Sequence, residues 1–295
     1  MPAPTKVLVL GASGRLGRAL LRIYRGAGIS ASALSHTDLD LSRPEDIATR
    51  LARYEFDVLI NTAGITDVDY CEANEGLAMT VNGQAPGAAA AHCRERGARF
   101  VQISTDYVFD GAGREPITED MPCKPVNAYG RSKLEGEQTA VAALPEALVL
   151  RVSWLFGIEK SSFPDRIIRQ ARERLDVSAV NDKWACPTYA DDVCDWMLAL
   201  LSMDDVKGIF HLCNSGACSW QEYGEAALTI ASQLGVPLKT TSVRGHTMEG
   251  FAPFLAARPA YTALSTAKFT ALTGIQPRSW DAALEDYLRT KHLSR

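Results

Sequence analysis

The stretch KVLVLGASGRLG, residues 6–17, decides the fold. Its first part, KVLVL, is an apolar run that is typical of a parallel strand buried on both faces. The glycines that follow, Gly11, Gly14 and Gly17, have the spacing G-x-x-G-x-x-G and open a segment with helical periodicity. Gly11 suits a tight turn, Gly14 lets backbone N–H groups approach a pyrophosphate, and Gly17 lets the helix pack closely on the sheet. The stretch therefore predicts a strand–turn–helix unit that binds a dinucleotide at the helix N-terminus.

Strands and helices alternate along the first 155 residues. We expect strands at 6–10, 29–34, 57–64, 99–105 and 147–157, and helices at 17–28, 44–54, 75–96 and 128–143. This alternation is typical of an α/β fold with a Rossmann-type doubly wound parallel sheet and right-handed crossovers.

The alternation loosens after residue 157. We expect helices within 162–175, 191–202, 219–235, 265–274 and 279–288, a strand within 208–216 and an irregular segment at 176–189. Residues 1–155 should then form a dinucleotide-binding Rossmann domain. Residues 156–295 should form mainly a smaller C-terminal substrate-binding α/β domain, with some segments returning to the Rossmann domain. Such a domain is expected over the carboxyl edge of the sheet, where ligands of these sheets bind.

The composition argues against several classes of partner. The 295 residues are 46% hydrophobic and 22% charged, with a net charge of −4 and no long run of Lys or Arg, so neither nucleic acid nor an anionic membrane is expected as the main partner. No apolar stretch reaches the ~18 residues of a transmembrane helix, and the N-terminus lacks a signal-peptide pattern. The seven cysteines include no C-x-x-C pair, so we expect reduced thiols in a cytoplasmic protein and no metal site. A homodimer is left open.

The segment NAYGRSK, residues 127–133, places Tyr129 and Lys133 four residues apart at the start of a predicted helix. Side chains at this spacing share one helix face, and a cation beside a phenol lowers the pKa of the phenol. We therefore expect Tyr129 to act as a general acid with Lys133 as its partner. Thr105 ends a predicted strand at the carboxyl edge of the sheet, where it is placed to hold a substrate carbonyl oxygen. Tyr107 is a second candidate for the acid, but it has no Lys one turn later.

The end of the second predicted strand indicates which dinucleotide binds. NAD sites usually carry an acid there, whereas this chain has Ser35 and His36, followed slightly later by Asp38 and Asp40. Arg15 and His36 are candidates for holding a 2′-phosphate, so we expect NADPH as the cofactor, with NADH left open. Asp40 is expected to face the adenine amino group.

Motifs along nearly the whole chain resemble one known family. The motifs GASGRLG, NTAG, STDYVFDG, NAYGRSK and RVSWLFG together resemble the extended short-chain dehydrogenase/reductases. The segments ITDVDYCE, VNDKWACPTY, GIFHLCNSGACSW and RPAYTALSTAKF are similar, more narrowly, to the dTDP-4-dehydrorhamnose reductases. This resemblance implies a nucleotide-sugar substrate and the NAD(P)H-dependent reduction of the 4-keto group of dTDP-4-dehydro-6-deoxy-L-mannose to dTDP-L-rhamnose.

The resemblance also implies roles for individual residues. It makes Tyr129 the proton donor, Lys133 its partner and Thr105 the residue that tunes the acid. It places Thr105, Asp106 and Trp154 against the sugar nucleotide. The residues that it places around the cofactor are Gly11, Ser13, Gly14, Arg15, Leu16, Gly17, Asp40, Leu41, Ala63, Gly64, Ile65, Thr66, Ile103, Tyr129 and Lys133. Arg258, in the segment RPAY, is a further candidate that pairs with a substrate diphosphate or, equally well, forms a surface salt bridge.

Departures from the family pattern keep alternatives open. A Lys that the family often has after the third strand is absent from AGITDVDY (63–70), and a carboxylate is added there, so another nucleotide-sugar reductase or epimerase is one alternative. Some members use a Glu after the last fingerprint glycine to hold magnesium, but Arg18 and Ala19 stand there in this chain, so no metal is expected. A second alternative is a non-catalytic dinucleotide-binding subunit resembling the regulatory beta subunit of methionine adenosyltransferase, which also keeps a Tyr and a Lys.

Overall fold

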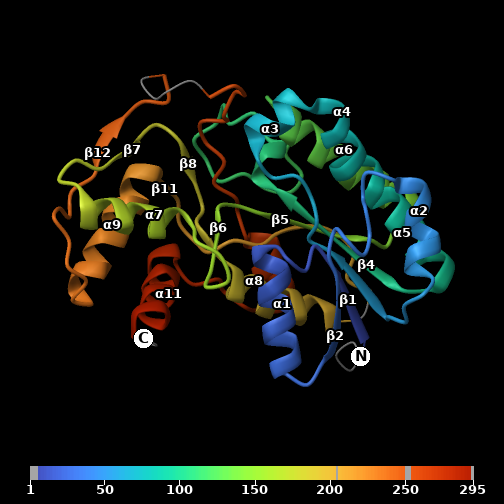
Figure 1. The fold of residues 1–295 in the computed structure, drawn as a ribbon. Helices are drawn as coiled ribbons and strands as arrows, with labels where there is room; N and C mark the ends of the chain where they lie inside the picture. Colours follow the sequence, from blue (N-terminus) through green and yellow to red (C-terminus); the bar gives the residue numbers. More distant parts are fainter. Residues whose placement is uncertain (1–5, 204, 250–253, 294–295) are drawn as a thin grey trace.

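A six-stranded parallel sheet forms the centre of the computed structural model, which describes residues 6–203, 205–249 and 254–293 (Figure 1). The strands follow the order β10–β5–β4–β3–β1–β2. Their bounds are β1 (Lys6–Leu10), β2 (Ser30–Leu34), β3 (Val58–Asn61), β4 (Arg99–Thr105), β5 (Leu148–Val152) and β10 (Gly208–His211). The strand order reverses between β1 and β3, so the sheet is doubly wound and a ligand is expected at that point of its carboxyl edge. The predicted α/β fold is confirmed.

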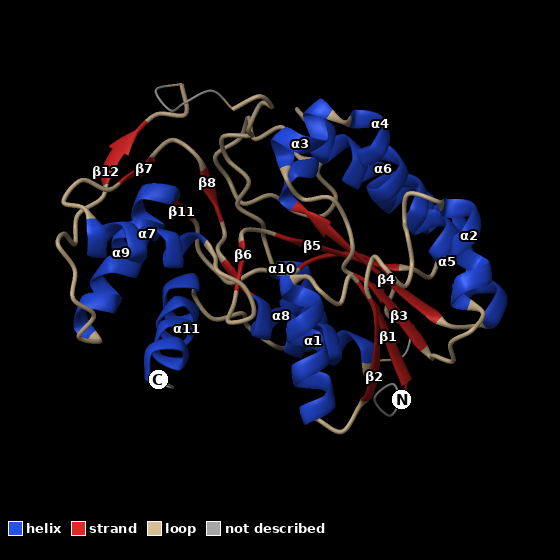
Figure 2. Ribbon diagram, in the orientation of Figure 1, coloured by secondary structure: helices blue, strands red, loops and turns tan. Residues whose placement is uncertain are grey.

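Helices cover both faces of this sheet (Figure 2). One face carries α1 (Arg15–Gly26) and α8 (Ala190–Leu201), and the other carries α2 (Pro44–Leu51), α5 (Ala85–Arg96) and α6 (Ala128–Ala143). Along β1, Val7 and Val9 belong to the first core, whereas Leu8 and Leu10 belong to the second. Both faces of β1 are therefore apolar, which explains the run of apolar residues in its sequence. None of the helices in the described ranges is long and apolar enough to cross a membrane.

A third apolar core lies beside the sheet and comes from the later part of the chain (Figure 1). Its helices are α7 (Phe163–Glu173), α9 (Trp220–Gln233) and α11 (Trp280–Leu293). Short paired strands accompany them: β6 (Leu155–Phe156) with β9 (Thr188–Tyr189), β7 (Ser178–Val180) with β12 (Arg244–His246), and β8 (Trp184–Ala185) with β11 (Cys218–Ser219). Helix α8, strand β10 and Phe269 of α10 (Ala267–Thr273) instead pack with the first core. A domain boundary at residue 155 stays a prediction.

Three segments differ from the sequence-based expectation. The strand predicted at 147–157 is divided into β5 and β6, because Trp154 adopts a φ of +37°, outside the strand region. The helix predicted at 75–96 consists of α4 (Glu75–Ala78), a π-helical turn (Met79–Gln84) and α5. The segment 176–189, expected to be irregular, contains β7, β8 and β9. Four short elements were not predicted, namely α3 (Val68–Ala73), a 3-10 turn at Asp106–Val108, β11 and β12.

Candidate active site

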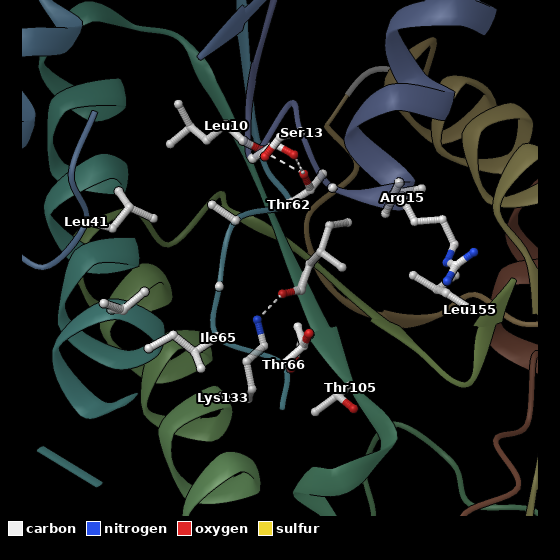
Figure 3. Close-up of a pocket in the computed structure, with 18 of the residues that line it drawn as sticks. Leu10, Ser13, Arg15, Leu41, Thr62, Ile65, Thr66, Thr105, Lys133 and Leu155 are labelled. Carbon is white, nitrogen blue, oxygen red and sulfur yellow. Dashed lines mark hydrogen bonds between the residues drawn. The ribbon is translucent and has the colours of Figure 1, made fainter. Parts of the chain in front are cut away.

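A cavity of about 770 Å³ opens at the carboxyl edge of the sheet (Figure 3). Its volume lies within the range typical of cofactor and substrate sites. Nearly all the residues singled out from the sequence line it: Gly11, Ser13, Gly14, Arg15, Leu16, Asp40, Leu41, Ala63, Gly64, Ile65, Thr66, Ile103, Thr105, Asp106, Tyr129, Lys133 and Trp154. Gly17 and Arg258 are not among the lining residues. The structure thus brings together side chains that lie more than a hundred positions apart in the sequence.

The glycine turn between β1 and α1 forms one end of the cavity. Gly11 has a φ of +78°, and a Cβ there would lie 2.6 Å from the backbone N of Ala63. A Cβ on Gly17 would lie 2.4 Å from the carbonyl O of Gly11, so only glycine lets α1 approach the turn this closely. Gly14 lies at the N-cap of α1, whose first amides have no partner within the helix. This cradle fits the pyrophosphate of a dinucleotide.

Polar side chains that follow β2 also line the cavity. Ser35, His36 and Asp40 line the cavity after the end of β2, and Lys160 of the loop after β6 lines it too. The carboxylate of Asp40 accepts hydrogen bonds from the N–H and the hydroxyl of Ser42. Ser35 and His36 stand directly after β2, and the N–H and the hydroxyl of Ser35 donate to Oδ2 of Asp38 at 2.8 and 2.7 Å, so a carboxylate also lies at this strand end.

Arg15 lines the cavity and is bonded to the loop after β6. Its guanidinium donates to the carbonyl O atoms of Gly157 at 3.3 Å, Lys160 at 2.5 Å and Ser161 at 3.0 Å. These bonds turn the side chain toward the loop after β6 (Figure 3). Contact between Arg15 and a 2′-phosphate stays a prediction.

Helix α6 presents Tyr129 and Lys133 to the opposite end of the cavity. The helix begins after Asn127, whose side chain accepts a hydrogen bond from the N–H of Gly130 at 2.8 Å. A Cβ on Gly130 would lie 2.2 Å from the carbonyl O of Tyr107, so this glycine lets α6 pack tightly on the turn after β4. Both Tyr129 and Lys133 are buried, and the Nζ of Lys133 donates to the carbonyl O of Ile103 at 2.6 Å.

The protonation of this pair differs from the sequence-based expectation. Burial raises the pKa of Tyr129 above its ordinary value, although the nearby Thr105 hydroxyl opposes the shift. Burial also lowers the pKa of Lys133 to about 8, and the carboxylate of Glu137 opposes that shift. The expected lowering of the tyrosine pKa is therefore wrong for this structure, because desolvation by burial raises this pKa. The phenol stays protonated at neutral pH, which is the state that a proton donor requires.

Thr105 and Asp106 form a buried network beside Tyr129. The hydroxyl of Thr105 donates to Oδ1 of Asp106 at 3.1 Å and accepts from the N–H of Tyr107 at 3.3 Å. Oδ2 of Asp106 accepts from the hydroxyls of Ser153 at 3.1 Å and Thr262 at 2.5 Å. Asp106 is only 2% exposed, so its carboxylate is committed to the protein itself. A direct contact between Asp106 and a sugar stays a prediction.

A second cavity of about 310 Å³ shares Tyr107, Trp154 and Leu155 with the first. The other lining residues come from β6, α7 and α9 and are mostly aromatic: Phe156, Phe163, Arg166, Trp220 and Tyr223. The guanidinium of Arg166 lies over the ring of Phe163, 5.3 Å from its centroid. The sequence analysis did not identify this cavity. Its residues lie on separate elements, and no local spacing in the sequence signals that they meet.

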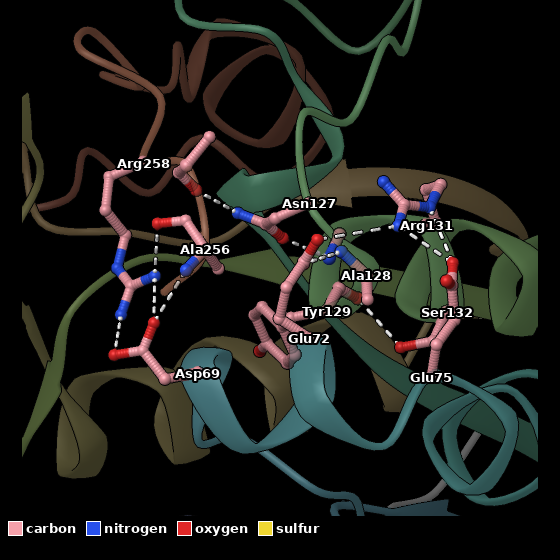
Figure 4. Close-up of polar contacts among 12 residues, drawn as sticks. Asp69, Glu72, Glu75, Asn127, Ala128, Tyr129, Arg131, Ser132, Ala256 and Arg258 are labelled. Atoms are coloured by element: carbon pink, nitrogen blue, oxygen red, sulfur yellow. Dashed lines mark hydrogen bonds and ion pairs between the residues drawn. The ribbon is translucent and has the colours of Figure 1, made fainter. Parts of the chain in front are cut away.

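Arg258 is not among the residues that line either cavity, and Figure 4 shows its guanidinium facing the carboxylate of Asp69. It forms a two-armed ion pair with Asp69 of α3, with distances of 3.1 Å from Nη1 to Oδ1 and 3.0 Å from Nη2 to Oδ2. The salt-bridge alternative considered for Arg258 is thus present in this structure. Asp67, a carboxylate in the segment that departs from the family pattern, caps α3 by accepting from the N–H of Tyr70.

Several known proteins are similar in sequence to this chain over nearly its full length. The family described as "RmlD substrate binding domain" matches residues 5–293. The chain is 34% identical to a spore coat polysaccharide biosynthesis protein of Bacillus subtilis, covering 97% of this chain and 98% of that protein. It is 34% identical to the dTDP-4-dehydrorhamnose reductase of Streptomyces griseus, covering 95% and 91%. It is also 34% identical to a dTDP-4-keto-6-deoxy-D-glucose reductase of Streptomyces niveus, covering 94% of each.

A solved structure is similar over the same length. The dTDP-4-dehydrorhamnose reductase of Bacillus anthracis, in complex with NADP, superposes with a TM-score of 0.90 at 29% identity. The match covers 97% of this chain and 99% of the other. The two chains therefore share one fold from end to end.

Proposed function

The chain belongs to the dTDP-4-dehydrorhamnose reductase family, and we propose that it reduces the 4-keto group of dTDP-4-dehydro-6-deoxy-L-mannose to give dTDP-L-rhamnose, with NADPH as the reductant. The observation that carries the proposal is the single cavity that joins the glycine turn to Thr105, Tyr129 and Lys133. A dinucleotide site and a proton donor at opposite ends of one cavity are the two parts that reduction of a ketone requires.

The protein groups supply the proton and the orientation. When NADPH is bound, it supplies a hydride to the carbonyl carbon C4. Tyr129 gives its phenolic proton to O4, so that the ketone becomes a secondary alcohol. Thr105 lies beside Tyr129, and to hold O4 its hydroxyl would turn from Oδ1 of Asp106 toward the ketone. Lys133, fixed by the carbonyl of Ile103, keeps a positive charge near the phenol and the nicotinamide ribose.

The cofactor assignment follows from the end of β2. Ser35 and His36 stand directly after β2, where NAD sites usually carry an acid for the ribose 2′-hydroxyl. The NADP complex of the Bacillus anthracis reductase supports the same choice. NADH remains an alternative, which the assay below distinguishes by comparing the two cofactors.

The second cavity suits the nucleotide half of the substrate. The partly exposed aromatic rings of Phe163 and Trp220 are candidates for stacking with a pyrimidine base. Arg166 is the cationic residue among the described residues that line this cavity, and it is placed to meet a diphosphate. Because the cavity adjoins the first one at Trp154, a dTDP-sugar bound there would direct its sugar toward Tyr129.

A second candidate function is the reduction of a different dTDP-4-keto-6-deoxy sugar. The relative from Streptomyces niveus that is named for dTDP-4-keto-6-deoxy-D-glucose is as similar to this chain as the rhamnose-forming one from Streptomyces griseus. Tyr70 stands where the family often has a Lys, and it is 48% exposed. The regulatory-subunit alternative also keeps a Tyr and a Lys, so this pair does not separate it from an enzyme; the relatives named as reductases favour the enzyme.

The cellular setting is a further part of the proposal. Reduced thiols at all seven cysteines fit the cytoplasm. A homodimer stays a prediction.

The test is a coupled assay. Two upstream enzymes convert dTDP-glucose into dTDP-4-dehydro-6-deoxy-L-mannose, and the purified protein is then added with NADPH or NADH. We expect absorbance at the nicotinamide wavelength to fall faster with NADPH, and we expect dTDP-L-rhamnose as the product. Turnover that yields a different deoxysugar would favour the second candidate. Cofactor binding without oxidation, on any dTDP-4-keto sugar tried, would refute the proposal.

A further inference from the structure

The segment 256–262, which we call the strap, connects four parts of the molecule that lie around Thr105 and Tyr129. Its hydrogen bonds reach α3, the start of α6, the segment around β8, and the turn after β4. The strap adds its own backbone to β8, because the N–H of Trp184 donates to the carbonyl O of Ala260 at 2.7 Å and the N–H of Thr262 donates to the carbonyl O of Trp184 at 2.9 Å. It is therefore a fixed part of the site and not a free surface loop.

Arg258 fastens the first half of the strap to α3 (Figure 4). Its two terminal nitrogens pair with the two carboxylate oxygens of Asp69, and the N–H of Ala256 donates to the same carboxylate at 2.9 Å. Nη1 of Arg258 also donates to the carbonyl O of Ala256 at 3.0 Å. The side chain of Arg258 is 9% exposed and that of Asp69 is 38% exposed. A two-armed pair in this setting holds both direction and distance, because the planar guanidinium matches the carboxylate.

The strap then meets both catalytic elements. Nδ2 of Asn127 donates to the carbonyl O of Ala257 at 2.7 Å, while Oδ1 of the same side chain caps α6 two residues before Tyr129. At the other end, the hydroxyl of Thr262 donates to Asp106, which in turn accepts from the hydroxyl of Thr105. The strap therefore helps to fix the start of α6, which carries Tyr129. It also helps to fix the carboxylate of Asp106, which accepts a hydrogen bond from Thr105.

A buried cation completes the connection. Lys183 is fully buried, and its Nζ donates to the carbonyl O of Pro259 at 2.7 Å. The same Nζ lies 4.7 Å from the centroid of the Tyr107 ring and 5.9 Å from the centroid of the Trp154 ring. Movement of the strap would remove the carbonyl acceptor from the buried ammonium of Lys183, which costs free energy. Lys183 therefore couples the position of the strap to the rings of Tyr107 and Trp154.

We propose that Arg258 is a positioning residue that acts through Asp69 and the strap on Tyr129 and Thr105, and that it does not bind the substrate diphosphate. The proposal rests on the proposed reductase function for its kinetic readout. Its geometric basis is independent of the substrate, because both arms of the guanidinium are already committed and Arg258 does not line either cavity.

A double-mutant cycle tests this inference. The variants are Asp69→Asn, Arg258→Gln and the double variant, assayed for kcat and for KM of the nucleotide sugar. If Arg258 acts only through Asp69, each single variant should lower kcat by about tenfold, as expected of coupled contacts. The kcat of the double variant should then be no lower than that of the less active single variant. The KM of the nucleotide sugar should change by less than about threefold in all three, since no substrate contact is removed.

The opposite pattern would overturn the proposal. An Arg258→Gln variant whose KM for the nucleotide sugar rises tenfold or more, while Asp69→Asn leaves KM unchanged, would make Arg258 a substrate ligand. The exposed pair Arg244–Asp176, with a separation of 2.9 Å, is the matched control. Arg244→Gln and Asp176→Asn should leave both constants unchanged.

Hydrogen exchange separates failure of this inference from failure of the proposed function. Without any substrate, exchange in the peptide covering 127–133 should accelerate in Asp69→Asn and Arg258→Gln, whereas the Arg244→Gln control should not change it. Unchanged exchange in both strap variants would refute the positioning role even if the wild-type protein proved inactive on dTDP-4-keto sugars. Accelerated exchange would support the role whatever the sugar.

Discussion

The ammonium of Lys133 donates a 2.6 Å hydrogen bond to the carbonyl oxygen of Ile103, which ties the helix of the proposed proton donor to the strand that ends in Thr105. The bond fixes the distance between α6 and β4 in the part of the site where the ketone must lie. It also explains how a lysine can be buried at the bottom of a cavity, because at least one of its three donors is satisfied by the backbone.

Replacing Tyr129 by Phe should abolish most of the turnover. General acids contribute roughly 10²- to 10⁴-fold, so kcat should fall by that factor. NADPH affinity should change little, because the variant keeps the aromatic ring and the glycine turn. Steady-state kinetics and a fluorescence titration with NADPH measure the two effects. Loss of turnover in Tyr107→Phe, with activity retained in Tyr129→Phe, would assign the acid to Tyr107.

The pH dependence should report on Lys133. Burial lowers the pKa of this ammonium to about 8, so its positive charge is present below that pH and is lost above it. The value of kcat/KM for NADPH should therefore fall about tenfold per pH unit above pH 8, because the charged form is the one that supports cofactor and acid. The Lys133→Met variant should have a low value without this decline.

The same shift predicts the direction of the stability change. Between about pH 8 and the ordinary pKa of 10.5, the folded protein binds fewer protons at Lys133 than the unfolded chain does. The free-energy cost of burying the charged Lys133 is present below pH 8 and decreases as the pH rises through this window, so the free energy of unfolding should increase there.

Burial also lowers the pKa of Lys183 to about 8. A decline in kcat/KM that persists in Lys133→Met but disappears in Lys183→Met would therefore assign the pH dependence to Lys183.

Two glycines of α1 should respond in opposite ways to alanine. A Cβ on Gly17 would lie 2.4 Å from a backbone oxygen, whereas a Cβ on Gly26 meets nothing within 4 Å. Gly17→Ala should lower the free energy of unfolding by about 1–3 kcal/mol through overpacking, and it should weaken NADPH binding. Gly26→Ala should raise the free energy of unfolding by up to about 1 kcal/mol, because alanine is the better helix former. Urea unfolding and an NADPH titration measure these changes; equal behaviour of the two variants would contradict the close approach at the turn.

Arg166 should govern affinity for the nucleotide. Arg166→Gln should raise the Kd of dTDP by about tenfold, since charge-assisted bonds to phosphate contribute about 1.5–3 kcal/mol, while leaving the Kd of NADPH unchanged. Arg169→Gln, one turn along the same helix and outside the cavity, is the matched control. Titration calorimetry with dTDP alone measures the effect without turnover. Equal affinity for dTDP in the two variants would place the diphosphate elsewhere.

Substitutions at Trp154 should reveal backbone strain beside the proposed sugar site. Its φ of +37° is unfavourable for any residue with a Cβ and costs about 1–3 kcal/mol. Trp154→Gly should therefore be more stable than Trp154→Ala by about 1 kcal/mol, the reverse of the usual order within a strand. Urea unfolding of the two variants compares them directly. A more stable alanine variant would show that the protein does not maintain this conformation.

The sequence was most informative where structure depends on neighbours along the chain. The glycine turn, the strand β4 and the helix α6 were predicted with the bounds that the structure has, or nearly so, because each is specified by residues within a few positions. Tyr129 and Lys133 belong to this group, since one helical turn relates them. The break at Trp154 was not predicted, because a tryptophan in an apolar run gives no local sign that its backbone will leave the strand conformation.

The sequence by itself therefore determined the doubly wound fold, the dinucleotide turn and the spacing of the acid and its lysine, all of which follow from short-range periodicity and from the sterics of glycine. Only the tertiary structure decided that Asp106 is enclosed by Ser153 and Thr262, that Arg258 pairs with Asp69, and that Arg166 meets Trp220 at a second cavity. The same structure decided the protonation of Tyr129, whose pKa is raised because burial removes water from the phenol. Desolvation and long-range pairing depend on how distant segments pack, and no local pattern in a chain encodes them.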